Sequence, residues 1–419
     1  MNGRARVDGA RLRADLQALS RLGADPSGDG ITRTGFSRED GLARDWYAGR
    51  VRASGLDLTE DGLGNTFAFD PDAEQTVPGV WSGSHLDTVP RGGAFDGAVG
   101  AVAALEVLRR VKELGLRPQR PLRAVVFSDE EGNYGSLLGS TGLCRGWSRA
   151  ELEAMTGRDG DRLTDALAAW GHARGDRTAT RLEPGALHAF VELHIEQGPV
   201  LERMGLPLGV VLGTKGVERH NITFHGQEAH SGSTPMNERR DALAAAAKLA
   251  LEIRAIAKKH QDAVCTMGSV KTFPGIVTAV VGRCEVTLDQ RDLDAAVLAQ
   301  MYREAQEASQ RFAQEEKCTV GWSRLWNIEP VPFHPQLLRL CQEAIRETAG
   351  RSHSMPSGPL HDAAEVCRAG IPTVMMFVQS LKGISHNKIE DTREEHLEMS
   401  VVALDRLASK TMDWIVKQR

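Results

Sequence analysis

Three segments in the first half of the chain share one pattern, a short apolar run that ends in polar and ionisable side chains. The segments are GVWSGSHLD (79–87), PLRAVVFSDEEG (121–132) and AFVELHIEQG (189–198). Such runs predict buried strands, and the apolar spacing of residues 97–114 predicts a helix between the first two. Because open α/β sheets bind ligands beyond the carboxyl ends of their strands, the polar ends of the segments predict a common site.

A different pattern begins near residue 213. VERHNITFHG (217–226) and VGRCEVTLDQRDLD (281–294) alternate like half-buried strands, and helices are expected at residues 241–260 and 295–317. This β-α-β-β-α-like order predicts a smaller α/β sandwich over residues 213–329.

The first pattern returns after residue 330, with a helix from Pro335, a buried strand at 372–378 and a closing helix from Glu394. We therefore predict an α/β fold: a mixed-sheet domain built from residues 1–212 and 330–419, with the smaller sandwich inserted as residues 213–329. A length of 419 residues agrees with two domains. The Arg-bearing amino-terminal stretch lacks an unbroken apolar run, so it predicts an amphipathic helix rather than a targeting segment.

Charge and cysteine usage narrow the function. A formal net charge of -5 and a pI near 6.3 disfavour nucleic acid and anionic membranes as partners, and favour a small-molecule substrate. No apolar run reaches the roughly 18 residues that a membrane span needs. The six cysteines are scattered without a CxxC pair, which indicates reduced thiols in a cytoplasmic protein. A metal site must then be built from histidines and carboxylates.

Five polar clusters could supply that site. They lie at residues 85–87, 96–97, 129–132, 192–194 and 385–387. Alone, each is more often a surface or capping feature, but five of them beside buried strands or glycine-rich loops indicate a shared cleft. Three imidazoles and two carboxylates suit Zn²⁺, Mn²⁺ or Co²⁺, and a carboxylate can bridge two ions roughly 3.5–4 Å apart that activate one water. Of the adjacent Glu130 and Glu131, one can bind metal while the other accepts the proton of that water.

The order of these clusters resembles a known family. The stretches GSHLDTVPRGGAFDGAVG, FSDEEGNYG with GSTG, ELHIEQGPVLE, HSGSTPMNERRDA and GISHNKIEDT are similar to the hydantoinase/carbamoylase branch of the co-catalytic zinc peptidase-like amidases. That branch includes N-carbamoyl-L-amino acid hydrolases, β-ureidopropionases, allantoate amidohydrolases and ureidoglycolate amidohydrolases. The resemblance covers residues from about 83 to 392.

The resemblance implies two divalent metal ions per subunit, zinc or else manganese or cobalt. His85 and His194 would hold one ion, Glu131 and His386 the other, and Asp96 would bridge them. This assigns all five metal ligands of the predicted site.

The resemblance also implies the catalytic groups. Glu130 would be the general base, and Asp87 would orient His85 and fix its tautomer. His230 would stabilise the oxyanion, either from the partner subunit or after domain closure, although a histidine at this place can also be a simple turn residue.

Four further residues would contact substrate. Arg291 would pair with a substrate carboxylate, although a charged residue in a strand often faces solvent instead; Gln197, Thr278 and His361 would line the pocket. The chain departs from the family at two places. Thr278 stands where the family has an asparagine, and residues 359–360 are Pro-Leu where it has Ala-Gly, which predicts a pocket of altered polarity and shape.

The leading hypothesis is therefore a metal-dependent amidohydrolase that cleaves a non-peptide C–N bond of an N-carbamoyl or related carboxylate-bearing amide. An aminoacylase or dipeptidase using the same two metals is the second hypothesis. A non-catalytic binding protein is the third, and the intact Glu130 and metal ligands disfavour it. The resemblance further implies a homodimer formed through the inserted lid or dimerisation domain.

Overall fold

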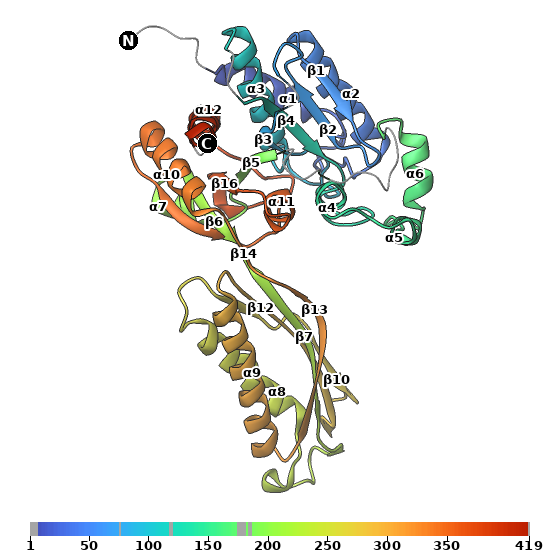
Figure 1. Ribbon diagram of the computed structural model, residues 1–419. Coiled ribbons are helices and arrows are strands. Elements are labelled where there is room, and N and C mark those ends of the chain that lie inside the picture. Colours follow the sequence, from blue (N-terminus) through green and yellow to red (C-terminus); the bar gives the residue numbers. More distant parts are fainter. Residues whose placement is uncertain (1–6, 75–76, 117–119, 174–181, 183–186, 418–419) are drawn as a thin grey trace. The chain divides into compact units, whose positions relative to one another are not determined.

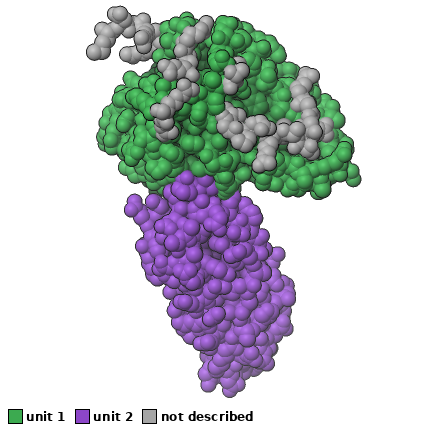
Figure 2. Space-filling model, viewed as in Figure 1, with its two compact units in different colours: residues 1–212, 333–419 green, residues 213–332 purple. Residues whose placement is uncertain are grey.

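The computed structural model describes residues 7–74, 77–116, 120–173, 182 and 187–417 (Figure 1). The chain forms two compact units, which are described one at a time. Unit 1 comprises Met1–Leu212 with Phe333–Arg419, and unit 2 comprises Gly213–Pro332 (Figure 2). The insertion expected at residues 213–329 thus starts where unit 2 starts, and unit 2 continues to Pro332.

A nine-stranded mixed sheet forms the centre of unit 1, in the order β1-β2-β4-β3-β5-β16-β6-β14, with β15 on β6; the two-residue strand β14 at its end consists of the last two residues of unit 2. Its strands are β1 (Asp57–Glu60), β2 (Thr66–Phe69), β3 (Gly79–His85), β4 (Leu122–Phe127), β5 (Leu187–Ile195), β6 (Leu208–Thr214), β14 (Val331–Pro332), β15 (His353–Ser357) and β16 (Thr373–Val378). The four strands β4, β3, β5 and β16 run parallel, while β2 and β6 are antiparallel to their inner neighbours. Because β3 and β16 are buried along their whole length, they carry the nearly continuous apolar runs of a sheet covered on both faces.

Helices cover this sheet. They are α1 (Gly9–Leu19), α2 (Arg38–Ala53), α3 (Ala98–Glu113), α4 (Leu138–Cys144), α5 (Arg149–Ala154), α6 (Leu163–Trp170), α7 (Val200–Met204), α10 (Pro335–Ala349), α11 (Asp362–Arg368) and α12 (Glu394–Lys417), with a 3₁₀ turn η2 (Leu381–Gly383). The main core joins α1, α3, α10 and α12 to the central strands, whereas α11 packs on β5, β16 and α4. In α3, a side chain at Gly100 would meet the Leu193 carbonyl oxygen at 2.1 Å, so the glycine lets this helix approach β5 closely.

Unit 2 is an antiparallel sheet with two helices on one face. Its elements are β7 (Gly216–His225), β8 (Ala229–His230), η1 (Met236–Glu238), α8 (Ala242–Ala257), β9 (Val264–Thr266), β10 (Val270–Phe273), β11 (Ala279–Val280), β12 (Arg283–Asp292), α9 (Ala295–Glu315) and β13 (Thr319–Ile328). The strand order is β10-β12-β7-β13, with β9 on β12, and β8 pairs separately with β11. In β12 alternate residues are buried, and Cys284, Val286 and Leu288 enter a core shared with α8 and α9.

The structure confirms the predicted fold class, a mixed α/β domain with a smaller inserted sandwich (Figure 1). The expected helices and strands are present with ends shifted by a few residues, and β13, which was not predicted, adds a strand after the predicted β-α-β-β-α order. The predicted amino-terminal helix is α1, and residues 1–6 lie outside the described part of the chain. Among the described residues, no helix is both long and apolar enough to span a membrane.

Candidate metal centre

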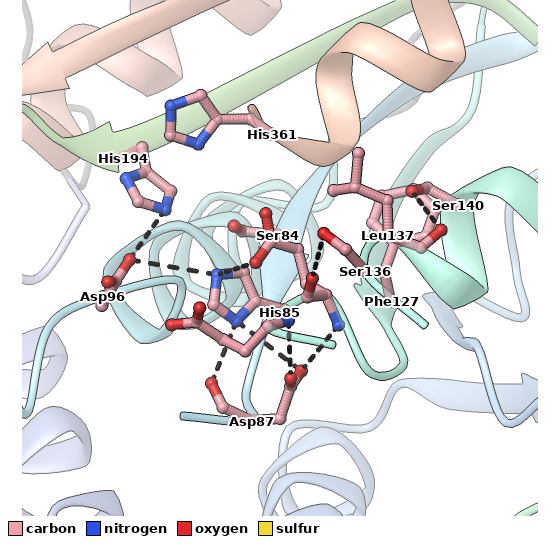
Figure 3. A network of polar contacts seen from close by, with 12 residues as sticks. Ser84, His85, Asp87, Asp96, Phe127, Ser136, Leu137, Ser140, His194 and His361 are labelled. Carbon is pink, nitrogen blue, oxygen red and sulfur yellow. Dashed lines mark hydrogen bonds and ion pairs between the residues drawn. The ribbon is translucent and has the colours of Figure 1, made fainter. Parts of the chain in front are cut away.

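Loops at one edge of the unit 1 sheet bring the five predicted ligands together. His85 ends β3, His194 lies near the end of β5, and Asp96 precedes α3. Figure 3 shows these three side chains turned toward one another. Potential ligand atoms lie within 4.8 Å of each other in two groups, His85 with Asp96 and His194, and Asp96 with Glu131 and His386. The two groups share Asp96.

Each oxygen of Asp96 faces a different group. Its Oδ1 lies 3.1 Å from His194 Nε2 and 4.0 Å from His85 Nε2. Its Oδ2 lies 3.2 Å from His386 Nε2, which is itself 3.4 Å from Glu131 Oε1. This arrangement suits a carboxylate that serves two neighbouring cation sites.

Backbone carbonyls fix the orientation of two of the imidazoles. His85 Nδ1 lies 3.0 Å from the Asp87 carbonyl oxygen, and His194 Nδ1 lies 2.9 Å from the Ile195 carbonyl oxygen. Because a carbonyl can only accept, each Nδ1 carries the proton and Nε2 is the nitrogen left for a metal. Both Nε2 atoms face Asp96.

Unpartnered buried atoms show that the centre fits a cation. His194 Nε2 and Glu131 Oε1 are buried and, although they lie 3.1 Å from Asp96 Oδ1 and 3.4 Å from His386 Nε2, neither contact has hydrogen-bonding geometry among the described residues. Buried polar atoms are rarely left in this state. Burial and the nearby Asp96 raise the pKa of Glu131 to about 8, and burial together with Glu131 raises the pKa of Glu130 well above its usual range. Imidazole and carboxylate donors around such atoms fit a divalent metal ion.

A third possible ligand group, Glu192 with His194 and His361, supports the centre instead of forming another site. Glu192 Oε1 accepts a hydrogen bond from Ser84 Oγ at 2.7 Å, and Oε2 accepts one from the Ala363 N–H at 2.9 Å. Both oxygens are therefore engaged, and Glu192 ties β5 to β3 and to the start of α11.

Asp87 positions the glutamate pair as well as His85. Its carboxylate accepts the backbone N–H groups of Glu130 at 3.3 Å and Glu131 at 3.0 Å. The predicted orientation of His85 uses the Asp87 carbonyl, since the carboxylate Oδ1 lies 3.6 Å from the ring nitrogen. Glu130 points its Oε2 to within 3.6 Å of His85 Nε2, so a carboxylate without a ligand assignment borders the centre.

Two supporting residues were not predicted from the sequence. Glu390 Oε1 accepts the backbone N–H groups of Phe95 at 2.9 Å and Asp96 at 3.0 Å. Ser385 Oγ lies 2.9 Å from Asp96 Oδ2 and 2.8 Å from Glu390 Oε2. Both residues belong to the GISHNKIEDT stretch, and their position around His386 was the only signal that could have indicated them.

Three loops of the centre contain a non-glycine residue in the left-handed region: Asp129, Gln197 and His386, with φ of 49°, 54° and 54°. Such conformations persist where surrounding contacts hold them. The Asp129 carboxylate provides these contacts by accepting the N–H groups of Asn133 at 2.7 Å and Tyr134 at 2.9 Å. The loop that carries the glutamate pair is thereby held in one conformation.

Two predicted substrate contacts lie beside the centre. Gln197 Nε2 donates to Asp96 Oδ2 at 2.9 Å, and Gln197 Oε1 is buried without a partner among the described residues. The His361 ring centroid lies 4.4 Å from that of His194, and burial lowers the pKa of His361 well below its usual value. His361 is therefore a neutral imidazole next to the predicted metal ligand His194.

The remaining three predicted residues belong to unit 2. β8 pairs with β11 there, so His230 lies opposite Ala279, and the Thr278 carbonyl accepts the Ser231 N–H at 2.9 Å. His230 Nδ1 accepts the Gly232 N–H at 3.1 Å, which in the neutral ring places the proton on Nε2. Arg291 lies on β12 and donates through Nε to Asp289 Oδ1 at 2.8 Å. The structure thus places the residue after His230 in contact with Thr278 and gives Arg291 a carboxylate neighbour.

Comparisons with known proteins identify the family of the chain. Residues 81–410 match the family described as Peptidase family M20/M25/M40. The chain is 35% identical over 413 residues to the N-carbamoyl-L-amino acid amidohydrolase of Geobacillus stearothermophilus, which covers 93% of this chain and 95% of that protein. It is 33% identical over 392 residues to the allantoate amidohydrolase of Escherichia coli, covering 93% and 94% of the two chains.

A solved structure is similar to the chain over nearly its whole length. A hydantoinase/carbamoylase family amidase from Burkholderia ambifaria is similar with a TM-score of 0.90 at 32% identity, over 97% of this chain and 98% of that chain. The chain therefore belongs to peptidase family M20/M25/M40, and within it to the hydantoinase/carbamoylase amidases.

Proposed function

We propose that the protein is a metal-dependent amidohydrolase that removes the carbamoyl group from a ureido compound carrying a carboxylate. The products would be a free amine, ammonia and carbon dioxide. The observation that carries this proposal is the pair of three-residue ligand groups that share Asp96, with Glu130 at their border. The amidohydrolase relatives support the choice of a non-peptide C–N bond.

We further propose that the centre holds two divalent ions, Zn²⁺ or else Mn²⁺ or Co²⁺. His85 and His194 would bind one, Glu131 and His386 the other, and Asp96 both; the two orphaned atoms, one in each group, support this count. Bound ions of this kind polarise a carbonyl group and lower the pKa of water.

The residues of the chain then have separate tasks. Glu130 takes the proton of the attacking water and passes it to the leaving nitrogen, while Asp87 holds the backbone of the glutamate pair in place. His230 donates its Nε2–H to the developing oxyanion, which the Gly232 hydrogen bond on Nδ1 favours.

The four predicted substrate contacts would act in two pairs. Arg291 pairs with the substrate carboxylate, and Thr278 contacts the same end of the substrate. Gln197 and His361 contact the end that carries the scissile carbonyl, because they lie beside the ligands.

One experiment tests the function. Purified, chelated protein is reloaded with Zn²⁺, Mn²⁺ or Co²⁺ and screened on ureido acids, allantoate, ureidoglycolate, N-acyl amino acids and dipeptides. Ammonia release from ureido substrates supports the proposal. Release of amino acid from acylated substrates or dipeptides alone would establish the aminoacylase or dipeptidase alternative, and tight binding without turnover would establish a binding protein.

We also propose that residues 213–329 form a lid and dimerisation domain and that the protein is a homodimer. β13 lies at one edge of the unit 2 sheet, and its Leu325 and Trp326 are exposed, so this edge offers both backbone pairing and apolar contact. Light scattering at micromolar concentration should give twice the chain mass, and a fully active monomer would contradict the proposal. The six free thiols support a cytoplasmic location.

A further inference from the structure

One ring nitrogen of His361 is already engaged before any substrate arrives. Ser357 Oγ lies 2.9 Å from His361 Nε2, and the same hydroxyl donates to the Pro359 carbonyl oxygen at 2.9 Å. A hydroxyl has one proton, and a carbonyl can only accept. The Ser357 proton is therefore used on Pro359, and His361 Nε2 must be the donor in its contact with Ser357.

This assignment leaves His361 Nδ1 as a hydrogen-bond acceptor. Among the described residues, no hydrogen bond engages Nδ1, since the one that His361 makes involves Nε2. The ring is held edge-on between His194 and Phe377, with centroid separations of 4.4 and 5.9 Å. Figure 3 shows it beside His194, at the centre. Its neighbours do not supply a proton, because Glu192 is an acceptor already bound by Ser84 and Ala363.

A second acceptor lies at the same centre. Gln197 Nε2 donates to Asp96 Oδ2, and a carboxylate cannot donate in return, so the orientation of the amide is fixed. Gln197 Oε1 is then a buried acceptor without a partner among the described residues. Two neutral acceptors thus lie beside the predicted metal ligands, one in the loop after β5 and one directly before α11.

We infer that His361, fixed as the Nε2–H tautomer by Ser357, selects substrates whose scissile carbonyl bears an NH₂ group, by accepting one of its N–H bonds at Nδ1. This inference rests on the proposed function and names its specificity residue. A carbamoyl group and an acetyl group have nearly the same shape, but a methyl group leaves the acceptor unpaired. Sites that hydrogen-bond a substrate group discriminate strongly against an analogue without that group.

The test uses N-carbamoyl and N-acetyl derivatives of one amino acid, chosen as the fastest in the substrate screen. The metal-loaded wild-type enzyme should prefer the carbamoyl compound in kcat/KM. His361→Phe keeps an aromatic ring between His194 and Phe377 and removes the acceptor. It should lower kcat/KM for the carbamoyl compound by about tenfold or more relative to any change in the value for the acetyl compound, so that the carbamoyl-to-acetyl ratio falls.

Ser357 is the positioning residue, and its variants test the tautomer. Ser357→Ala should reduce the carbamoyl-to-acetyl ratio, and Ser357→Thr, which retains a hydroxyl, should restore it. His188→Phe is the matched control, because His188 is a half-buried histidine of β5 that bonds only the Pro78 carbonyl among the described residues. The carbamoyl-to-acetyl ratio of His188→Phe should equal that of the wild type. Metal content is measured for every variant.

The outcomes separate the inference from the function on which it rests. If neither compound is hydrolysed, the proposed function fails and the inference fails with it. If His361→Phe lowers kcat/KM for the carbamoyl and the acetyl compound equally, the proposed function remains supported and the inference is wrong. A readout without turnover is the ¹⁵N spectrum of the histidines: assigned against His361→Phe, it should show His361 protonated at Nε2, and protonation at Nδ1 would overturn the inference even where the kinetics agree.

Discussion

At the scale of single residues, the adjacent carboxylates of Glu130 and Glu131 differ in the groups that surround them. Glu131 faces His386 and carries an orphaned oxygen, whereas Glu130 turns toward His85. Asp87 holds both backbone N–H groups, so neither side chain can exchange places with the other without breaking these bonds. The two glutamates should therefore respond differently to the same substitution.

Glu130→Gln should reduce kcat by about 10²–10⁴-fold while leaving metal content unchanged, because an amide cannot accept the proton of the attacking water. Glu131→Gln is the matched comparison and should lose metal, since it removes a predicted ligand. Initial rates combined with metal analysis of the dialysed proteins measure both effects. Wild-type turnover by a fully metallated Glu130→Gln enzyme would rule out Glu130 as the base.

Metal binding at neutral pH should release protons from the two histidines beside Asp96. Burial lowers the pKa of His194, but the Asp96 carboxylate raises it further, to about 9, and the Asp96 carboxylate raises the pKa of His386 to about 9. Both rings must lose a proton before Nε2 can bind a metal. Calorimetric titration of the chelated protein with Zn²⁺ in buffers of different ionisation enthalpy counts these protons, and a buffer-independent heat would contradict the prediction.

At the scale of elements, glycines decide how closely the ligand loops approach each other. Gly97 caps α3 with a φ of 63°, and a Cβ there would lie 2.4 Å from three atoms of the His85 ring. Gly97 has no side chain that could bind a metal, but the absence of that side chain leaves the space that the His85 ring occupies.

Gly97→Ala should therefore displace His85 and weaken metal binding by roughly tenfold or more, the range seen when groups behind a ligand are changed. Gly115→Ala is the matched control, because its φ of 59° imposes similar backbone strain while no atom lies within 4 Å of the new Cβ. Competition with a chromogenic chelator measures both affinities. Equal loss in the two variants would show that strain alone, and not contact with His85, causes the effect.

The sequence predicted those elements whose pattern is long or whose polar residues follow a buried strand. β3, β5 and β16 each carry a mostly apolar run, so His85 and His194 were recognisable as residues at strand ends. Strands of four residues such as β1 and β2 are too short to show a period, and they were not predicted. Contacts between distant segments were also beyond the pattern: nothing local in Glu390 indicates that it binds the backbone of Asp96.

At the scale of the whole molecule, the crowded charges of the centre make the metal-free protein sensitive to pH. The pKa of Glu131 is raised from 4.5 to about 8, and the pKa values of His194 and His386 are raised from 6.5 to about 9. A group with a raised folded pKa binds more protons in the folded state, so its stabilising effect is lost as pH rises through the folded value. The pKa of His85 is lowered to about 4. Above pH 6.5, the pKa of this ring in the unfolded chain, His85 is neutral in both the folded and the unfolded state, so it does not oppose this trend.

The melting temperature of the chelated protein should therefore fall as pH rises from about 6.5 to 8, the window in which these three groups act together. The metal-loaded protein should change less, because bound cations replace the protons. Differential scanning calorimetry over this range, with and without chelator, checks the prediction. A melting temperature of the chelated protein that increases with pH would contradict the assigned direction of the shifts.

The position of β16 sets the order of events while the chain is being synthesised. β16 lies between β5 and β6, although all of unit 2 separates it from them in the sequence. A ribosome-bound chain that ends within unit 2 would leave β5 and β6 with unpaired backbone edges, which invite pairing with other chains. His386 would also still be missing from its ligand group. The sheet of unit 1 and the full set of predicted metal ligands can therefore form only after His386 has been synthesised, near the end of translation.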